Sequence, residues 1–455
     1  MKKDREIFKR ALVLAVPMMI QNGITNAVGL VDNIMVGSLG TEAITAVSIA
    51  GQLIFVFNLG IFGGLSGPGI YGAQYYGQKN VEGFRAAVRI KHLISFAVLA
   101  LGLCLFIFGG DWLIGLYLKG ESADIDPVLT RELSRSYLNI MLWGLPPFVF
   151  TQIYASSLRE TGESLKPMIA GVASVVVDVV FNWLLIYGNL GFPELGVRGA
   201  AIATVMARFA ECFIVVISTF AARKKKHEFM ISLYKTLLVP RNVAKKMLIK
   251  TLPIFFNEFL WAGGIAVLTQ CYSQRGLDIV AGLNISNALC NLLNVVFIAL
   301  GNAVGILIGQ TLGAKRYDDA KRESFKLMWF TGAVSFILTA ILVSISAIFP
   351  NLYDTSEEVR SYAASFIIIT ALFFPVQGFL NALYFTLRSG GKTLVTFFFD
   401  SVFSWVVSIP TAFLLCQFSP LPILAIYAII QAADLIKVCV GYALIRKGVW
   451  ISNIV

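Results

Sequence analysis

The sequence predicts an all-α integral membrane protein, with twelve transmembrane helices arranged as two pseudo-symmetric six-helix lobes. Of its 455 residues, 57% are hydrophobic and only 14% are charged, whereas a soluble domain of this length carries roughly 25% charged residues. Apolar stretches recur along the whole chain, and a chain in lipid satisfies its backbone groups by forming helices. The two halves of the sequence also repeat one another.

The apolar stretches define the expected spans. About 20 apolar residues cross the hydrocarbon core at a rise of 1.5 Å per residue. The first stretch is too long for a cleaved signal peptide and contains an aspartate, Asp32. The expected spans are 11–36, 46–74, 91–109, 134–157, 167–188, 199–221, 248–270, 280–308, 327–349, 360–386, 394–416 and 422–445.

The basic residues set the predicted topology. The net charge of +11 could suggest a nucleic-acid partner. With the N-terminus in the cytoplasm, however, most of the 37 Lys and Arg residues fall in inside segments, as the positive-inside rule requires. We therefore expect a multi-pass protein of the inner (plasma) membrane with both termini cytoplasmic and no nucleic-acid partner. The two histidines, His92 and His227, are expected at membrane-edge or loop positions.

The repeat relates residues of the two halves at nearly fixed offsets. Each half holds an even number of spans, so both copies enter the membrane in the same direction and form parallel repeats. Two such bundles can rock around a central cleft and expose it alternately to each side of the membrane. This arrangement favours a secondary transporter over a channel. At an offset of 236 residues the matches are Pro17/Pro253, Asn58/Asn294, Gly69/Gly305, Gln74/Gln310 and Gly77/Gly313, and at 229 they are Pro146/Pro375, Arg159/Arg388 and Arg208/Lys437.

The longest inside loop, with a basic run at 223–226, divides the chain nearly in half. The predicted organisation is an N-terminal six-helix lobe at 1–222, a cytoplasmic linker at 223–247 and a C-terminal six-helix lobe at 248–455.

Several segments carry a family resemblance. The first span reads VPMMIQNGITNAVGLVDNIMVGSLG, the fourth-to-fifth region reads LRETGESLKP and then VVVDVVFNWLLIYG, the sixth span opens with GVRGAAIAT, and the second half begins with LPIFFNEFLWAGG. In this order they resemble multidrug and toxic compound extrusion (MATE) transporters along essentially the full length.

The resemblance implies two lobes that open outward in a V. It also implies multidrug efflux, in which drug-like organic cations are exported in exchange for H⁺ or Na⁺ by alternating access. The wider superfamily includes flippases for lipid-linked precursors and polysaccharides, and a flippase is the alternative function.

Charged residues inside the spans are the candidates for function. An ionised side chain at mid-bilayer costs at least ~2.5–3.5 kcal/mol, so such residues face the interior or a water-filled cavity. The candidates are Asp32, Asp178, Arg208, Glu211, Glu258, Asp400, Asp434 and Lys437.

Asp32 is the first candidate for cation coupling. It lies fifteen residues after Pro17, which removes a backbone hydrogen bond and can bend the helix. Desolvation pushes a buried carboxylate toward its neutral form, so Asp32 could exchange a proton or accept Na⁺. In the resembling family this aspartate belongs to the cation site, and the proline-bent helix moves when it protonates. The alternative is an aspartate that only caps the helix end near Gly37.

Asp178 and Asn182 are four residues apart, so they share one face of the fifth helix. Beside Asp32 they would supply hard oxygen ligands for Na⁺ or a proton relay. Many family members have Asn and then Asp at these two positions, and the order is reversed here. Thr204 matches a position that can add a hydroxyl. Each of these residues could instead make a polar contact between helices.

A second substrate or cation site is expected in the C-terminal lobe. Glu258 resembles an acid that some Na⁺-coupled relatives carry, although it could instead pair with a loop lysine near the inner mouth. Asp400 lies in the eleventh span, and Gln377 stands where some relatives have an acid. The expected hinges are Pro17 and Pro253.

Two further charged pairs are spaced three residues apart, which places each pair on one helix face. They are Arg208 with Glu211 and Asp434 with Lys437, and we expect both to be structural or interlobe pairs.

No nucleotide-binding, zinc-protease, nucleophile-elbow or haem motif occurs in the sequence. We therefore expect no enzyme activity and no cofactor beyond the coupling ion. The expected partners are the small organic substrate, the ion and the lipid bilayer, and we expect a monomer.

Overall fold

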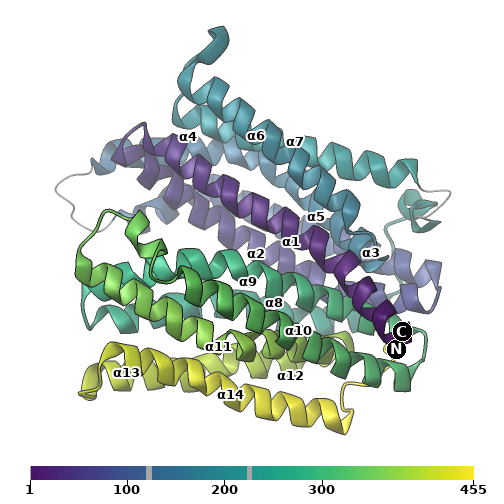
Figure 1. Ribbon diagram of the computed structural model, residues 1–455. Helices are drawn as coiled ribbons and strands as arrows, with labels where there is room; N and C mark the ends of the chain where they lie inside the picture. Colours follow the sequence, from purple (N-terminus) through teal and green to yellow (C-terminus); the bar gives the residue numbers. More distant parts are fainter. Residues whose placement is uncertain (1, 119–125, 223–227) are drawn as a thin grey trace. The chain divides into compact units, whose positions relative to one another are not determined.

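The computed structural model describes residues 2–118, 126–222 and 228–455, and these residues form helices and turns with no strand (Figure 1). The predicted basic run at 223–226 and His227 lie outside the described residues. The helices are α1 (Lys2–Gly37), α2 (Thr41–Gly77), α3 (Val81–Tyr117), α4 (Pro127–Met141), α5 (Leu145–Glu160), α6 (Leu165–Tyr187), α7 (Val197–Ala221), α8 (Arg241–Ser273), α9 (Leu277–Gly313), α10 (Tyr317–Ile345), α11 (Glu357–Ser389), α12 (Thr393–Phe397), α13 (Ile409–Phe418) and α14 (Ile423–Lys447).

The described residues include 11 helical segments long and apolar enough to cross a membrane. The remaining predicted span, 134–157, is not one continuous helix. Its two parts, α4 and α5, meet at a 3₁₀ turn, Leu142–Gly144. Pro146 and Pro147 stand in the first turn of α5, where a residue without an N–H group is tolerated, and they cannot donate to the preceding turn. The twelve-span prediction is confirmed with this interruption.

The eleventh span, predicted at 394–416 as an ordinary helix, has a different backbone. After α12, the chain forms two π-helical turns, Phe398–Val402 and Ser404–Ser408, before α13 begins. Such turns are rare and concentrate at functional sites. Asp400 lies in the first of them.

The sequence repeat is reproduced in the turns that join the helices. At the end of α2 the Lys79 N–H donates to the Tyr76 carbonyl oxygen at 3.0 Å, and at the end of α9 the Lys315 N–H donates to Leu312 at 2.9 Å. Left-handed backbone recurs at three matched positions in the two halves: Gly40 and Gly276, Lys79 and Lys315, and Gly162 and Gly391. The two halves are therefore built on one plan.

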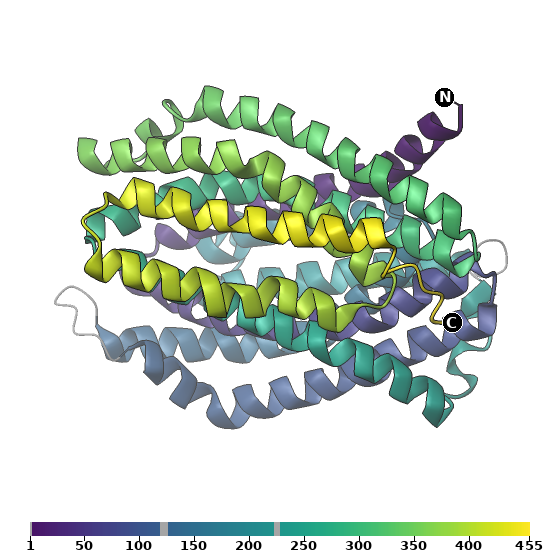
Figure 2. The same ribbon diagram turned by 90° about the horizontal axis from the view of Figure 1, so that it is seen from below.

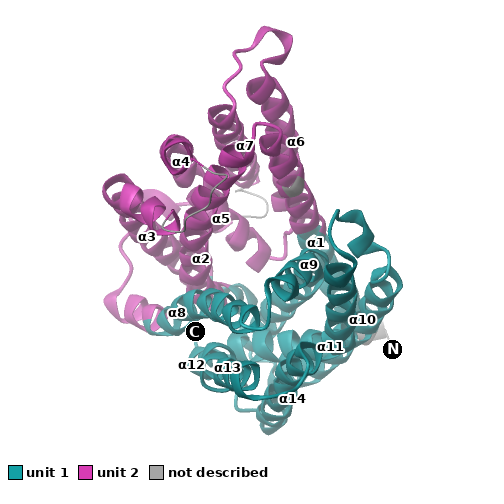
Figure 3. Cartoon of the chain, turned by 90° about the vertical axis from the view of Figure 1, so that its left-hand side faces the viewer, with its two compact units in different colours: residues 1–19, 73–80, 249–455 teal, residues 20–72, 81–248 magenta. Residues whose placement is uncertain are grey.

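The chain folds into two compact units (Figure 3). Unit 1 comprises 1–19, 73–80 and 249–455, and unit 2 comprises 20–72 and 81–248. In unit 1, α9 packs against α10 and α11, and α11 packs against α14. In unit 2, α7 packs against α4, α5 and α6. The predicted lobe and linker boundaries remain a prediction.

The first helix contributes to both units. Its inner part packs into the apolar core of unit 1, where Ala11 and Leu14 are buried with Leu307 and Ile308 of α9. The change of unit comes at residue 20, three residues after Pro17. Figures 1 and 2 show that α1 begins and α14 ends at the same end of unit 1.

Part of the predicted linker is attached to α3 in unit 2. Two 3₁₀ turns, Glu228–Met230 and Leu233–Lys235, present backbone carbonyl groups to this helix. Arg85 donates to the Phe229 carbonyl oxygen at 3.2 Å, and Arg89 donates to that of Leu233 at 3.1 Å. This stretch is therefore anchored and does not act as a free tether.

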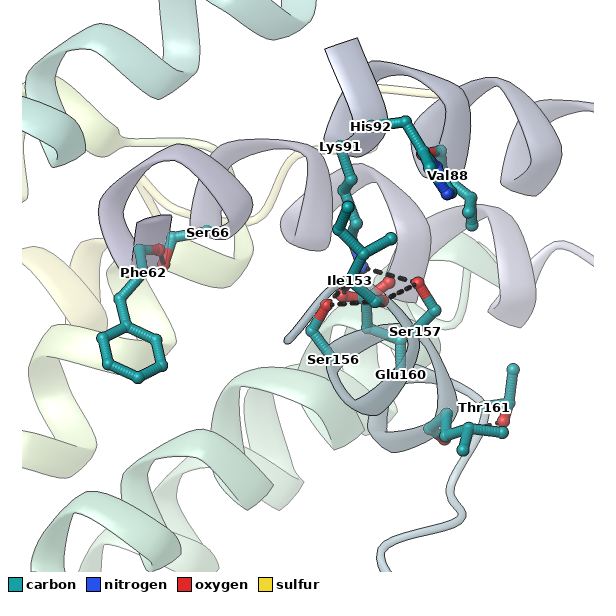
Figure 4. A network of polar contacts seen from close by, with 11 residues as sticks. Phe62, Ser66, Val88, Lys91, His92, Ile153, Ser156, Ser157, Glu160 and Thr161 are labelled. Atoms are coloured by element: carbon teal, nitrogen blue, oxygen red, sulfur yellow. Dashed lines mark hydrogen bonds and ion pairs between the residues drawn. The ribbon is translucent and has the colours of Figure 1, made fainter. Parts of the chain in front are cut away.

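A buried ion pair joins α3 to α5. Lys91 is fully buried, and its ammonium group donates to Glu160 at 2.5 Å and to the hydroxyls of Ser156 and Ser157 at 3.1 Å (Figure 4). Ammonium and carboxylate neutralise each other in a low-dielectric interior, where either one alone would be costly.

His92 is also fully buried, so it is not the surface histidine expected at the membrane edge. Its Nδ1 lies 2.8 Å from the Val88 carbonyl oxygen and its Nε2 lies 3.0 Å from the Tyr234 hydroxyl. Tyr234 comes from the anchored stretch, which covers the ring.

Replacing Gly162 by Ala tests the repeated turn. Gly162 has φ +91 and open space around an added Cβ, so the substitution isolates the backbone strain. We expect Gly162→Ala to lower stability by about 1–2 kcal/mol, measured by thermal melting of detergent-solubilised protein. Gly115→Ala, in helix α3 with equally open space, is the matched control. Equal melting temperatures for the two variants would contradict this account of the turn.

Candidate functional site

A polar cluster in unit 2 joins α1 to α6 and α7. The Asn182 side-chain amide donates to Asp32 at 2.8 Å. The Asp178 carboxyl, one turn earlier on α6, interacts directly with the Asp32 carboxyl and with the hydroxyl of Thr204 on α7. The structure thus brings together the four residues singled out as a cation-coupling set.

The cluster offers oxygen atoms to a cation. Asn182 is 1% exposed and Asp178 is 8% exposed. Within the described part of the chain, Asp178 Oδ1 and Asn182 Oδ1 have no hydrogen-bond partner. A buried acceptor without a donor is unfavourable, and carboxylate and amide oxygens are ligands suited to hard cations. The residues present therefore fit a proton or a Na⁺ ion.

Tyr137 of α4 also belongs to this cluster, and sequence reasoning missed it. Its side chain is buried and lies close enough to Thr204, Arg208 and Asp178 to interact with them. No spacing or motif in the sequence links a tyrosine at 137 to residues on α1, α6 and α7. Only the packing of α4 against α7 brings it to the site.

Arg208 lies beside the cluster. Its guanidinium lies 5.0 Å from the centroid of the Phe148 ring, and NH1 donates to the Gly144 carbonyl oxygen at 3.4 Å. Arg208 interacts electrostatically with Asp178 and also with Glu211, its neighbour three residues later. It therefore lies between the cation-coupling set and a second polar group.

That second group is organised by Gln21 of α1, which sequence reasoning also missed. Its side-chain amide donates to Glu211 at 3.3 Å and its carbonyl oxygen accepts from Arg159 at 3.0 Å. Gly171 of α6 leaves room for it, since an added Cβ would lie 2.7 Å from the Gln21 amide nitrogen.

Gln21 and Asp32 are separated by eleven residues, about three helical turns, so they lie on one face of α1. Polar contacts at Gln21 and at Asp32 therefore fix this half of α1 to the other helices of unit 2. The signal available in the sequence was this spacing on α1.

In unit 1, Asp400 is held by neighbours on α8 and on its own π-helical turn. The Asn257 amide donates to Asp400 at 2.9 Å, and the Ser401 hydroxyl donates to the Asn257 side-chain oxygen at 2.7 Å. Glu258, next to Asn257, interacts electrostatically with Asp400 and with Arg388.

The other predicted residues of unit 1 gather around Asp434 on α14. Lys437 Nζ lies 2.9 Å from Asp434, and the Gln377 amide donates to the other carboxylate oxygen at 2.6 Å. Lys437 also lies 4.9 Å from the centroid of the Phe403 ring. Gln377 therefore contacts Asp434 through a hydrogen bond. Pro17 and Pro253 both lie inside long helices, α1 and α8.

Membrane-crossing helices, two repeats and buried charge clusters define a multi-pass membrane protein of the kind that moves solutes. The MatE family model matches residues 17–184 and 253–414, one match in each half. The chain belongs to the MatE family. The two matches begin 236 residues apart, the offset of the sequence repeat.

Curated relatives match nearly the whole chain. The probable multidrug resistance protein YoeA of Bacillus subtilis is 25% identical over 448 residues, covering 97% of this chain and 94% of that protein. The probable multidrug resistance protein NorM of Pasteurella multocida is 26% identical over 416 residues, covering 90% and 86%.

Solved structures have the same fold. A MOP superfamily transporter from Pyrococcus furiosus aligns with a TM-score of 0.85 at 18% identity, covering 97% of this chain and 95% of that one. A variant of the Vibrio cholerae MATE transporter VcmN aligns with a TM-score of 0.86 at 16% identity, covering 100% and 99%.

Gln21→Leu tests the second polar attachment of α1. The change removes the amide that bridges Glu211 and Arg159, so we expect a loss of about 1–3 kcal/mol from partners left unsatisfied. Thermal melting in detergent measures it. Thr25→Val is the control. The Thr25 hydroxyl donates only to the backbone carbonyl oxygen of Gln21 within the same helix, at 2.9 Å, so its loss leaves Glu211 and Arg159 with their Gln21 partner. Equal melting temperatures for the two variants would show that Gln21 does not organise this polar group.

Proposed function

We propose that the chain is a secondary active antiporter that exports drug-like organic cations in exchange for inward-moving H⁺ or Na⁺. It acts by alternating access as a monomer in the inner (plasma) membrane, with both termini in the cytoplasm. The observation that carries this proposal is the closeness of the Asp32 and Asp178 carboxyls in a buried cluster where two oxygens have no hydrogen-bond partner among the described residues.

The pair of acids supplies the coupling. Two carboxylates this close in a low-dielectric site do not both remain ionised without a counter-charge. A proton or a Na⁺ ion entering from outside provides that charge. The same negative cluster attracts a cationic substrate from the cytoplasmic side, so the ion and the substrate compete for it, and arrival of one weakens the hold on the other.

The contacts of α1 link the competition between ion and substrate to a movement of this helix. A hydrogen bond to an ionised carboxylate is about twice as strong as one to a neutral acceptor, so neutralising Asp32 weakens its bond from Asn182. The part of α1 near Asp32 is then released while Gln21 keeps its contacts. Pro17 and Pro253 are the proposed hinges, and in α1 the chain passes into unit 2 three residues after Pro17.

The membrane potential supplies enough free energy to export a substrate against its gradient. Each charge that moves inward down 100 mV supplies about 2.3 kcal/mol, which supports roughly a forty-fold substrate gradient per charge if coupling is tight. Aromatic residues make up 13% of the chain, and such side chains suit the binding of flat organic cations. The names of the two curated relatives, both multidrug resistance proteins, agree with such substrates.

Asp32→Asn tests the proposal. The variant keeps the shape of the side chain but cannot gain or lose a proton, so we expect it to fold, insert and lose gradient-driven efflux. The measurement is dequenching of a fluorescent organic cation in proteoliposomes, with pH and Na⁺ gradients imposed separately to identify the ion.

Asp111→Asn is the control, because this carboxylate at the end of α3 is 55% exposed. It should transport like the unmodified protein. Unimpaired proton- or sodium-driven efflux by Asp32→Asn would overturn the proposed role of the cluster.

A further inference from the structure

The ends of α2 and α9 meet at positions that the repeat relates to each other. Gly77 of α2 lies against the Gln310 carbonyl group, and Gly313 of α9 lies against the Gln74 carbonyl group. Gly77 matches Gly313 and Gln74 matches Gln310 at an offset of 236, so the contact is reciprocal. A Cβ on either glycine would overlap the facing carbonyl oxygen. The two helix ends therefore approach this closely only because both residues are glycine.

The end of α2 belongs to a different unit from the rest of the helix. Residues 73–80 are part of unit 1, whereas 20–72 are part of unit 2. The helix itself is continuous from Thr41 to Gly77. The contact with α9 thus holds, within unit 1, the end of a helix that starts in unit 2.

The Gln74 side chain connects this contact to the residues that follow α14. Gln74 is fully buried. Its amide nitrogen donates to the carbonyl oxygens of Ser389 at 2.9 Å and Ser452 at 3.2 Å, and its side-chain oxygen accepts from the Ile454 N–H at 2.9 Å. One amide therefore binds the end of α11 with one hydrogen bond and the residues after α14 with two.

Residues 449–455, here named the strap, also bind the end of α9. The Asn453 side-chain amide donates to the carbonyl oxygens of Leu312 and Gly313 at 3.3 and 3.4 Å. Both groups lie in the last turn of a helix, where carbonyl groups have no partner within the helix. Polar contacts of the strap thus join the two helix ends that meet at the reciprocal contact.

Trp450 anchors the strap. Its side chain is fully buried in the apolar core of unit 1, and its backbone carbonyl group lies against Gly390, just after α11. At an offset of 229 its counterpart is Ala221, the last residue of α7, so this anchor is not repeated in the first half.

The two repeated glutamines are consequently bound by different parts of the chain. Gln310 accepts a hydrogen bond from Arg10 of α1 at 3.3 Å, whereas Gln74 is bound by the strap. The backbone contact between α2 and α9 follows the repeat, but the strap reinforces it from one side.

We propose that Gln74 and the strap hold the cytoplasmic ends of α2 and α9 together, and that the strap leaves Gln74 each time these ends separate to admit substrate. This inference rests on the proposed antiport, because alternating access requires an opening to the cytoplasm. Gln74 is a positioning residue in this cycle. Removing its hydrogen bonds shifts the population toward the state in which the two ends are apart.

A reversible cross-link tests whether the two helix ends separate during transport. A Cβ at Gly309 would lie 3.0 Å from that of Ala73. A disulfide needs roughly 3.8 Å, so the pair Ala73→Cys and Gly309→Cys can bridge after a small shift. We expect oxidation of this pair in proteoliposomes to stop dye efflux and dithiothreitol to restore it, while the unmodified protein continues to export the dye after oxidation. Efflux by the fully cross-linked protein would overturn the proposal.

Thiol labelling tests the part played by Gln74 and does not require transport. N-ethylmaleimide reacts with a buried thiol only when the thiol becomes accessible, and peptide mass spectrometry locates each adduct. In protein carrying Gly309→Cys, we expect Gln74→Leu to raise the labelling rate at position 309 at least about fivefold. The native Cys290, buried in the same helix, should label no faster.

Asn302→Ala is the matched control variant, because the Asn302 amide donates only to the Ile298 carbonyl oxygen within α9, at 2.9 Å. It should leave both labelling rates unchanged. Faster labelling of Cys290 together with position 309 would indicate general loosening of the fold, and an unchanged rate at position 309 would show that Gln74 does not hold the contact. Either result overturns the proposal.

The antiport and the strap fail in different ways. If the cross-linked protein transports while the unmodified protein still follows an ion gradient, the strap proposal is wrong and the antiport stands. If Asp32→Asn retains efflux, the proposed coupling is wrong, whereas the cross-linking and labelling results still decide whether the strap closes the contact.

Discussion

The cost of an unmatched charge in a medium that cannot solvate it governs the interior of this protein. Lipid surrounds the helices, so a buried carboxylate needs a base, a donor or a cation. Lys91 and Glu160 satisfy this requirement within the protein, and so do Lys437 and Asp434. Asp178 and Asn182 do not, since each keeps a buried oxygen without a partner among the described residues. That difference distinguishes the paired charges from the polar groups of the cluster around Asp32.

The duplicated plan shows which parts of the interior were retained in both lobes. The turns, the two bases and the amide on the first helix of each lobe occur at equivalent positions. The acids do not: Asp32 and Asp178 have no acidic counterparts in the second half, and Asp400 has a glycine as its counterpart in the first. The bases thus stand at equivalent positions in the two halves, whereas the buried acids stand at different ones.

Much of the fold could be predicted from the sequence because lipid constrains it strongly. Hydropathy gave the spans, and Asp32, Asp178, Asn182 and Thr204 could be grouped by helical spacing and family resemblance. Tyr137 and the contacts of Gln21 could not, because they depend on which faces of α4, α5 and α7 meet. The π-helical turns at Asp400 were also missed, since no residue type marks them.

The anchored stretch after residue 228 has a consequence for how the two units are connected. Its carbonyl groups are held by Arg85 and Arg89, and the first turns of α8 up to residue 248 also belong to unit 2. The covalent crossing into unit 1 therefore lies inside a helix, where a peptide has little slack compared with a flexible loop. Any change of direction at this crossing is therefore taken up by the backbone of α8, close to Pro253, and not by a connecting loop.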